Sequence, residues 1–204
     1  MEYYELHPVT PQIRFINKAV EVLKNGCVII YPTDTVYGIG CDIFNKEALE
    51  RVYDIKHDAG TKLFSFICPD LKDISKYAKV SDFAYKSMKK LLPGPYTFVL
   101  PAAREVPKKL WTKRNTVGIR VPNHPVALTL VKELGNPIVS TSVSTRKGEV
   151  LFDPSEIQAI FNSQVDLMLA TGALEGKPSS IVDLSGEEPE VIREGAGDVS
   201  MFFA

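Results

Sequence analysis

The chain contains 204 residues with a mass of 22.6 kDa, which is enough for one domain with a sizeable core. Apolar residues make up 45% of the sequence and charged residues 24%, a composition that argues against disorder. No stretch approaches about 18 consecutive apolar residues, and the first residues lack the order of a secretory signal. We therefore expect no membrane span and a cytoplasmic location. The three cysteines form no C-x-x-C pair, and we expect neither a disulfide framework nor a metal site on the protein itself.

The charge is unevenly distributed along the chain. Residues 1–148 contain 22 basic and 14 acidic residues, whereas residues 149–204 contain 2 basic and 11 acidic ones. Six basic residues lie from Arg104 to Arg120, with Glu105 as the single acidic residue between them. Such a basic section is typical of proteins that bind phosphates or nucleic acid, but it can equally be an ordinary solvated surface. The charge pattern leaves both interpretations open.

The first third of the sequence predicts helix, strand, helix and strand in turn. Thr10-Pro11 is typical of a helix start, apolar residues then recur at helical spacing, and Asn25-Gly26 is typical of a helix end. The apolar run 27–31 predicts a buried strand, followed by a loop at 32–38 and extended chain at 39–42. A helix at 46–56 and a strand at 63–68 come next.

The rest of the chain alternates in the same way. Ser81 and Pro93-Gly94 delimit a helix at 81–92. Further strands are expected at 96–100, 116–121, 138–142, 165–169, 180–184 and 191–193, and further helices at 125–134 and 154–161. The alternation predicts an α/β fold with an open sheet, in which the short late strands add mixed or antiparallel pairings. Because no segment has the composition of a linker, we expect a single domain over residues 1–204.

Four polar clusters end apolar runs, and they are the places where chemistry is expected. They are residues 32–38, Lys56-His57-Asp58 with Lys62, residues 118–122 around Arg120, and residues 140–144 with four hydroxyls. Ligands of open α/β sheets bind beyond strand ends, and hydroxyls and arginine suit carboxylate or phosphate oxygens. Each cluster alone could be a turn or a cap, and Arg120 could be paired with an aspartate inside the protein. Their joint placement favours a shared anion-binding cleft.

Five ordered motifs resemble the YrdC family. They are YPTDTVYGIG at 31–40, LPGPYTFVL at 92–100, TVGIRVP at 116–122, PIVSTS at 137–142 and REG at 193–195. The resemblance covers nearly the whole chain, and the motifs are most similar to the YciO-type branch. It implies a single YrdC-like α/β domain whose twisted open mixed sheet is flanked by helices and has a large concave basic face.

The family resemblance also implies a function. Members make threonylcarbamoyl-AMP from L-threonine, bicarbonate and ATP with release of pyrophosphate, for the threonylcarbamoyladenosine modification of tRNA. ATP is expected to arrive with Mg²⁺, and members are also associated with binding tRNA or double-stranded RNA. The hypotheses that follow are a nucleotidyltransferase of this kind, an RNA-binding protein without synthase activity, and carbamoyl transfer to another acceptor.

The resemblance assigns roles position by position. Lys56 and Arg120 would be the catalytic cations. Substrate would be held by Thr33, Thr35, Lys62, Ser140, Ser142, Ser179 and Ser180, and the nucleotide by Lys56, Thr116, Ser142, Ser144 and Arg193. Two positions depart from the family pattern, because Asp58 replaces the arginine of Lys-x-Arg and Ser144 replaces the asparagine of Ser-x-Asn. An aspartate repels phosphates where an arginine would bind them, so the departures predict weak or lost synthase activity.

Overall fold

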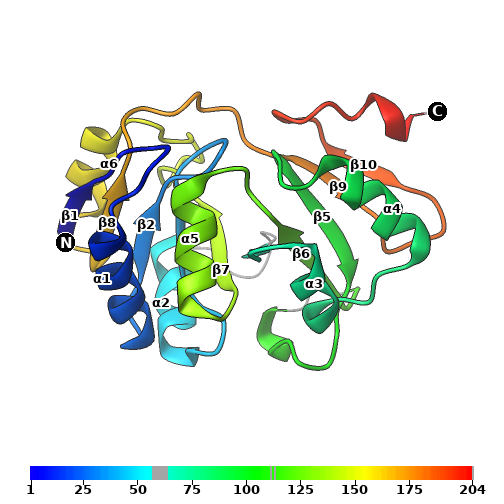
Figure 1. Cartoon of the computed structure of the whole chain (residues 1–204), viewed down its shortest axis with the longest axis horizontal. Coiled ribbons are helices and arrows are strands. Elements are labelled where there is room, and N and C mark those ends of the chain that lie inside the picture. The colour runs from blue at the N-terminus through cyan, green and yellow to red at the C-terminus, as the bar shows by residue number, and fades with distance from the viewer. Residues whose placement is uncertain (57–63, 111, 113, 204) are drawn as a thin grey trace.

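The computed structural model describes residues 1–56, 64–110, 112 and 114–203. Within these ranges ten strands form one mixed, twisted sheet in the order β1-β8-β2-β3-β7-β4-β6-β5-β9-β10 (Figure 1). The strands are β1 (Glu2–Glu5), β2 (Ile29–Tyr31), β3 (Gly38–Asp42), β4 (Ser65–Ile67), β5 (Tyr96–Pro101), β6 (Thr116–Arg120), β7 (Ile138–Ser142), β8 (Leu167–Ala170), β9 (Ser180–Asp183) and β10 (Glu190–Arg193).

Helices cover both faces of this sheet. They are α1 (Ile13–Lys24), α2 (Lys46–Lys56), α3 (Leu71–Tyr77), α4 (Asp82–Leu91), α5 (Pro125–Leu134) and α6 (Pro154–Phe161), with short 3₁₀ turns at Lys108–Leu110 and Ser200–Phe202. The apolar faces of α1 and α5 share one buried cluster, and those of α2, α3, α4 and α6 share another. None of the helices in the described ranges is long and apolar enough to cross a membrane.

The predicted α/β fold is confirmed, and several elements have the predicted bounds. Helices α2, α5 and α6 and strand β7 begin and end at the predicted residues. Ser81 caps α4 as expected, because its hydroxyl accepts the backbone N–H of Ala84 at 3.2 Å. Antiparallel pairing, expected for the late strands, also runs through the centre, where β3 is antiparallel to both β2 and β7. The six residues between β2 and β3 are too few for the crossover that a parallel pair requires.

Three sequence predictions need correction. Helix α1 begins at Ile13 rather than at Thr10-Pro11, because the Thr10 hydroxyl lies 3.0 Å from Nδ1 of His7 instead of capping the helix. Helix α3 is absent from the predicted elements, although Asp70 caps it by accepting the N–H groups of Lys72 and Asp73. Strand β1 is absent from them too, because this exposed edge strand has no apolar alternation among its charged residues.

Candidate functional site

A cavity of about 340 Å³ lies over the middle of the sheet. Its floor is a row of small side chains, since Ser140, Ser65, Gly118 and Val99 are paired neighbours on β7, β4, β6 and β5. The residues that alternate with them point into the core on the other side of the sheet, as Val139, Phe66, Ile119 and Phe98. The small residues therefore leave room above the strands that a row of larger side chains would fill.

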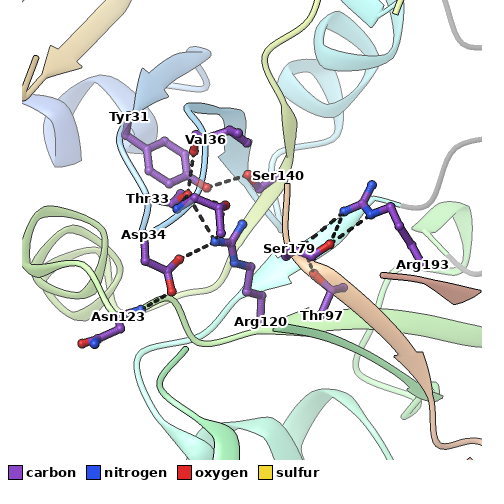
Figure 2. A network of polar contacts seen from close by, with 11 residues as sticks. Tyr31, Thr33, Asp34, Val36, Thr97, Arg120, Asn123, Ser140, Ser179 and Arg193 are labelled. Atoms are coloured by element: carbon purple, nitrogen blue, oxygen red, sulfur yellow. Dashed lines mark hydrogen bonds and ion pairs between the residues drawn. The ribbon is translucent and has the colours of Figure 1, made fainter. Parts of the chain in front are cut away.

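Arg120, the last residue of β6, is a cation of the cavity that three residues of one loop contact. Its Nη2 atom donates to the hydroxyl oxygens of Thr33 at 3.2 Å and Thr35 at 2.8 Å. The same nitrogen forms a buried ion pair with Asp34, whose other oxygen accepts the backbone N–H of Asn123 at 2.9 Å (Figure 2). The guanidinium is thereby held in one orientation by the loop between β2 and β3. Its Nε atom is buried and has no hydrogen-bond partner within the described part of the chain.

The hydroxyls of Thr33 and Thr35 act mainly on this arginine. Thr33 Oγ1 donates to the carbonyl of Val36 at 2.6 Å and accepts from Arg120 and from the backbone N–H of Thr35 at 3.2 Å. Its one hydrogen and two lone pairs are thus used inside the protein. Thr33 lines the cavity, whereas Thr35 is buried behind it. The expected contact of Thr33 and Thr35 with threonine stays a prediction. In the structure their hydroxyls accept hydrogen bonds from Arg120 and so orient its guanidinium.

Arg193, the last residue of β10, supplies a second cation. Its Nε and Nη2 atoms donate to the carbonyl of Ser179 at 3.0 and 2.7 Å. The hydroxyl of Ser179 lies 2.9 Å from that of Thr97 on β5, so β9, β10 and β5 meet at this end of the cavity (Figure 2). Burial, and secondarily the charge of Arg120, lower the pKa of Arg193. Two cations that repel each other across a cavity favour an anion between them.

Lys56, at the end of α2, supplies a third cation. It lies beside β7, on the side of the cavity opposite to Arg193. Its Nζ atom donates to the carbonyl of Ser142 at 3.0 Å and to the hydroxyl of Ser144. All three residues line the cavity, together with Ser140. Ser144 follows β7, and its backbone forms an isolated antiparallel bridge with Val150. The predicted residues of the hydroxyl-rich cluster after β7 and of α2 are therefore brought together.

The structure does not bring every predicted residue to the cavity. Ser180 is fully buried, and its hydroxyl donates to the carbonyl of Gly197 at 2.6 Å while accepting the N–H of Gly195. Thr116 lies at the far end of β6, where its hydroxyl is 2.7 Å from that of Thr112. Neither residue lines the cavity, so their ligand roles stay predictions. Lys62, together with His57 and Asp58, lies outside the described residues.

Thr97 and Tyr31 are two polar residues at the site that the sequence-based predictions do not include. Thr97 interrupts the apolar strand β5 with a hydroxyl, which is the same kind of signal that identifies Arg120 in β6. Tyr31 ends the apolar strand β2, where the pattern predicts a core residue, yet its hydroxyl donates to Ser140 at 2.7 Å. A buried polar atom needs a hydrogen-bond partner, so a tyrosine at the end of a buried strand indicates that a polar group lies nearby. This is the sequence feature that could have identified Tyr31.

The fold and the cavity together define an α/β protein with a cleft that is lined by hydroxyls and by three cationic side chains. A family model named Sua5_yciO_yrdC and described as "Telomere recombination" matches residues 21–195. The chain therefore belongs to the Sua5/YciO/YrdC family.

Known proteins resemble this chain over most of its length. It is 42% identical over 203 residues to the uncharacterised protein YciO of Escherichia coli K12, covering 98% of both chains. It is 31% identical to the threonylcarbamoyl-AMP synthase of Vibrio vulnificus YJ016 over 184 residues, covering 88% of this chain and 98% of the synthase.

Solved structures show the same fold. The crystal structure of E. coli YciO has a TM-score of 0.95 at 42% identity, covering 99% of this chain and all of the other. P. abyssi Sua5, crystallised with L-threonine, has a TM-score of 0.90 at 23% identity, covering 96% of this chain and 58% of Sua5.

Proposed function

We propose that this protein forms threonylcarbamoyl-AMP from L-threonine, bicarbonate and ATP, with pyrophosphate as the leaving group. The observation that carries the proposal is the placement of Lys56, Arg120 and Arg193 around one hydroxyl-lined cavity. Carboxylate and phosphate oxygens are the groups that such donors recognise. A ligand that carries both a carboxylate and phosphates would offer an anionic group to each of the three cations.

The relatives support the choice of reaction. The similarity to a threonylcarbamoyl-AMP synthase extends over 88% of this chain. The P. abyssi Sua5 structure of the same fold contains L-threonine, which supports this amino acid as a substrate. The greater similarity to the uncharacterised YciO leaves the reaction itself to be tested.

In this reaction the protein would act by positioning and by charge neutralisation. The amine of threonine and bicarbonate combine to a carbamate with loss of water. A carbamate oxygen then attacks the α-phosphorus of ATP, and the bond to the leaving pyrophosphate breaks. Arg120 would hold the carboxylate of threonine, while Lys56 and Arg193 would stabilise the charge on the phosphates. The site needs no covalent nucleophile for these steps.

Mg²⁺ would enter as part of the Mg–ATP substrate. The described residues contain no cluster of three or more acidic, histidine or cysteine side chains that could hold a metal ion. Asp34 is engaged by Arg120 and by the N–H of Asn123. The phosphates of ATP would therefore be the principal ligands of Mg²⁺, consistent with its usual binding in nucleotide sites.

Pyrophosphate release by the purified protein tests this proposal. The protein is incubated with Mg–ATP, L-threonine and bicarbonate, and the nucleotide product is identified by mass spectrometry. We expect release that requires both threonine and bicarbonate, and a product mass equal to threonylcarbamoyl-AMP. Release that is unchanged when threonine is omitted, or the absence of any release at high protein concentration, would refute the proposal.

A second candidate, binding of tRNA or double-stranded RNA, is favoured by one surface. Lys86, Lys89 and Lys90 are exposed on α4, where spacings of three and four residues place them on one helical face. Helix α4 packs against the side of the sheet opposite the cavity, so this function would use a different surface. RNA binding by this face should weaken steeply with salt and in Lys89→Ala/Lys90→Ala, while pyrophosphate release stays unchanged.

A further inference from the structure

Tyr31 and Ser140 form a buried hydrogen bond that the proposed reaction does not yet use. Tyr31 is fully buried beneath α1 and α5, and its hydroxyl donates to Oγ of Ser140 at 2.7 Å (Figure 2). Ser140 lies two strands away on β7, on the same face of the sheet, and it lines the cavity. The bond therefore connects the apolar core to the polar floor of the site.

The direction of this bond determines what Ser140 can do. A serine hydroxyl has one hydrogen to donate and two lone pairs that accept. Because Tyr31 occupies a lone pair, the hydrogen of Ser140 is left for another acceptor, and no hydrogen bond among the described residues uses it. Burial also raises the pKa of Tyr31, so its hydroxyl remains a neutral donor at physiological pH. The hydroxyl of Ser140 is therefore available as a hydrogen-bond donor to a ligand in the cavity.

Gly38 lies beside the hydroxyl groups of Tyr31 and Ser140, and its lack of a side chain leaves room for both. A Cβ atom on Gly38 would lie 2.9 Å from Oγ of Ser140 and 3.3 Å from the hydroxyl oxygen of Tyr31. Gly38 is the register partner of Tyr31 in β2 and of Ser142 in β7. Glycine at this position therefore allows the tyrosine and the serine to approach each other where β3 returns beside β2.

We propose that Tyr31 is a positioning residue that fixes the hydroxyl of Ser140 as a donor to a carboxylate oxygen of the ligand. Ser140 and Arg120 both line the cavity, where one carboxylate would accept from both side chains. A hydroxyl that accepts a hydrogen bond is also polarised into a stronger donor. The inference rests on the proposed function, in which the carboxylate belongs to L-threonine.

A double-mutant cycle in the complete protein tests the coupling. Pyrophosphate release is measured against threonine concentration for wild type, Tyr31→Phe, Ser140→Ala and the double variant. We expect KM for threonine to rise about fivefold in Tyr31→Phe and about tenfold in Ser140→Ala, with kcat changed less than twofold. The double variant should match Ser140→Ala, because Tyr31 acts only through that hydroxyl.

Phenylalanine retains the ring of Tyr31, which keeps its packing in the core. Tyr77→Phe on α3 is the matched control, and we expect it to leave KM unchanged. Thermal unfolding of each variant confirms that the assays compare folded proteins. If Tyr31→Phe raises KM equally in wild type and in the Ser140→Ala background, Tyr31 acts by packing and the positioning role is wrong.

A titration with acetate separates this inference from the proposed reaction, since acetate carries only the carboxylate. NMR shift changes that saturate in wild type and weaken in Tyr31→Phe, without any pyrophosphate release, would support the positioning role and reject the reaction. Pyrophosphate release with an unchanged KM for threonine in Tyr31→Phe would support the proposed reaction and reject the positioning role. Failure of both acetate and threonine to bind wild type would overturn the positioning role as well.

Discussion

Asp34 joins Arg120 to the segment that precedes α5. One carboxylate oxygen forms the ion pair with Arg120, and the other accepts the backbone N–H of Asn123 at 2.9 Å. Both side chains of the pair are about nine-tenths buried, so the two charges depend on each other for compensation. The carboxylate thereby orients the guanidinium and keeps the loop between β2 and β3 close to β6.

Asp34→Asn is expected to destabilise the protein strongly. Removal of one partner leaves a buried cation without compensation, which typically costs about 3 kcal/mol or more in the free energy of unfolding. Lys76→Gln is the control, because the Lys76–Asp73 pair is exposed and should be worth less than about 1 kcal/mol. Urea unfolding followed by circular dichroism measures both. Equal losses in the two variants would show that Asp34 is not needed to compensate Arg120.

Arg120→Ala is expected to weaken the binding of carboxylate or phosphate ligands much more than Arg104→Ala. Arg120 is 6% exposed within the cavity, where a charge-assisted bond is strong, whereas Arg104 is exposed to solvent. Isothermal titration with L-threonine and with ATP should show a loss of at least tenfold for Arg120→Ala and less than twofold for Arg104→Ala. Arg120→Lys retains the charge and tests whether the fork geometry matters. Similar affinities of both alanine variants would argue against this assignment of Arg120.

Most helices and strands of this fold are predictable from local signals in the sequence. Pro125 and Gly135 predict the two ends of helix α5, and the structure shows Gly135 in the left-handed conformation that a helix end favours. Strand order is not predictable in the same way. Pairings such as β3 with β7, or β5 with β9, join residues about 100 and 80 positions apart, and no local pattern encodes which strands meet.

The candidate site, too, is predictable from the sequence only where a local signal exists. Arg120 is recognisable because a charge inside an apolar strand needs a partner, but the sequence leaves open whether that partner is a ligand or an aspartate. The structure shows Asp34 as the internal partner. Ser180 and Thr116 have the expected residue types on the expected strands, but Ser180 pairs with Tyr96 on the face of the sheet opposite the cavity, and Thr116 lies at the other end of β6 from Arg120. Whether a strand residue reaches the cavity depends on which face of the assembled sheet and which part of the strand the cavity occupies, and neither is encoded by a local pattern.

The stability of the protein should fall below about pH 6.5 because of His124. This residue caps α5 through Nδ1, which accepts the N–H of Val126 at 3.3 Å, and burial lowers its pKa despite the opposing charge of Asp34. The unfolded chain therefore binds a proton at higher pH than the folded one. The contribution is fully present above the ordinary pKa of 6.5 and is lost as the pH falls through the lower folded value.

His124→Asn provides the measurement of this effect, since asparagine is a good cap that does not titrate in this range. Urea unfolding is followed at pH 7.5 and at pH 5.0 for both proteins. We expect wild type to lose more free energy of unfolding between the two pH values than His124→Asn. The carboxylates contribute equally to both proteins and cancel in this comparison. A wild-type loss equal to or smaller than that of the variant would contradict the role of His124.

The last prediction concerns the two departures from the family motifs, Asp58 and Ser144. Ser144 presents a short hydroxyl that accepts from Lys56, where the family's asparagine would offer a longer amide able to donate and accept. Asp58 stands where the family has an arginine, and a carboxylate adds repulsion toward phosphates instead of orienting the leaving pyrophosphate. Loss of one oriented donor commonly costs on the order of 100-fold in rate.

We therefore expect slow pyrophosphate release by wild type and a rise of about tenfold or more in Asp58→Arg/Ser144→Asn, with Mg²⁺ held constant. Ser144→Asn alone serves as the intermediate variant, because it changes the partner of Lys56 without changing the charge. The V. vulnificus synthase, assayed in parallel, provides the reference rate. A rescue of wild-type activity by raised Mg²⁺ would indicate that Asp58 works as a ligand for the metal on ATP. A wild-type rate equal to that of the synthase would show that neither substitution weakens the reaction.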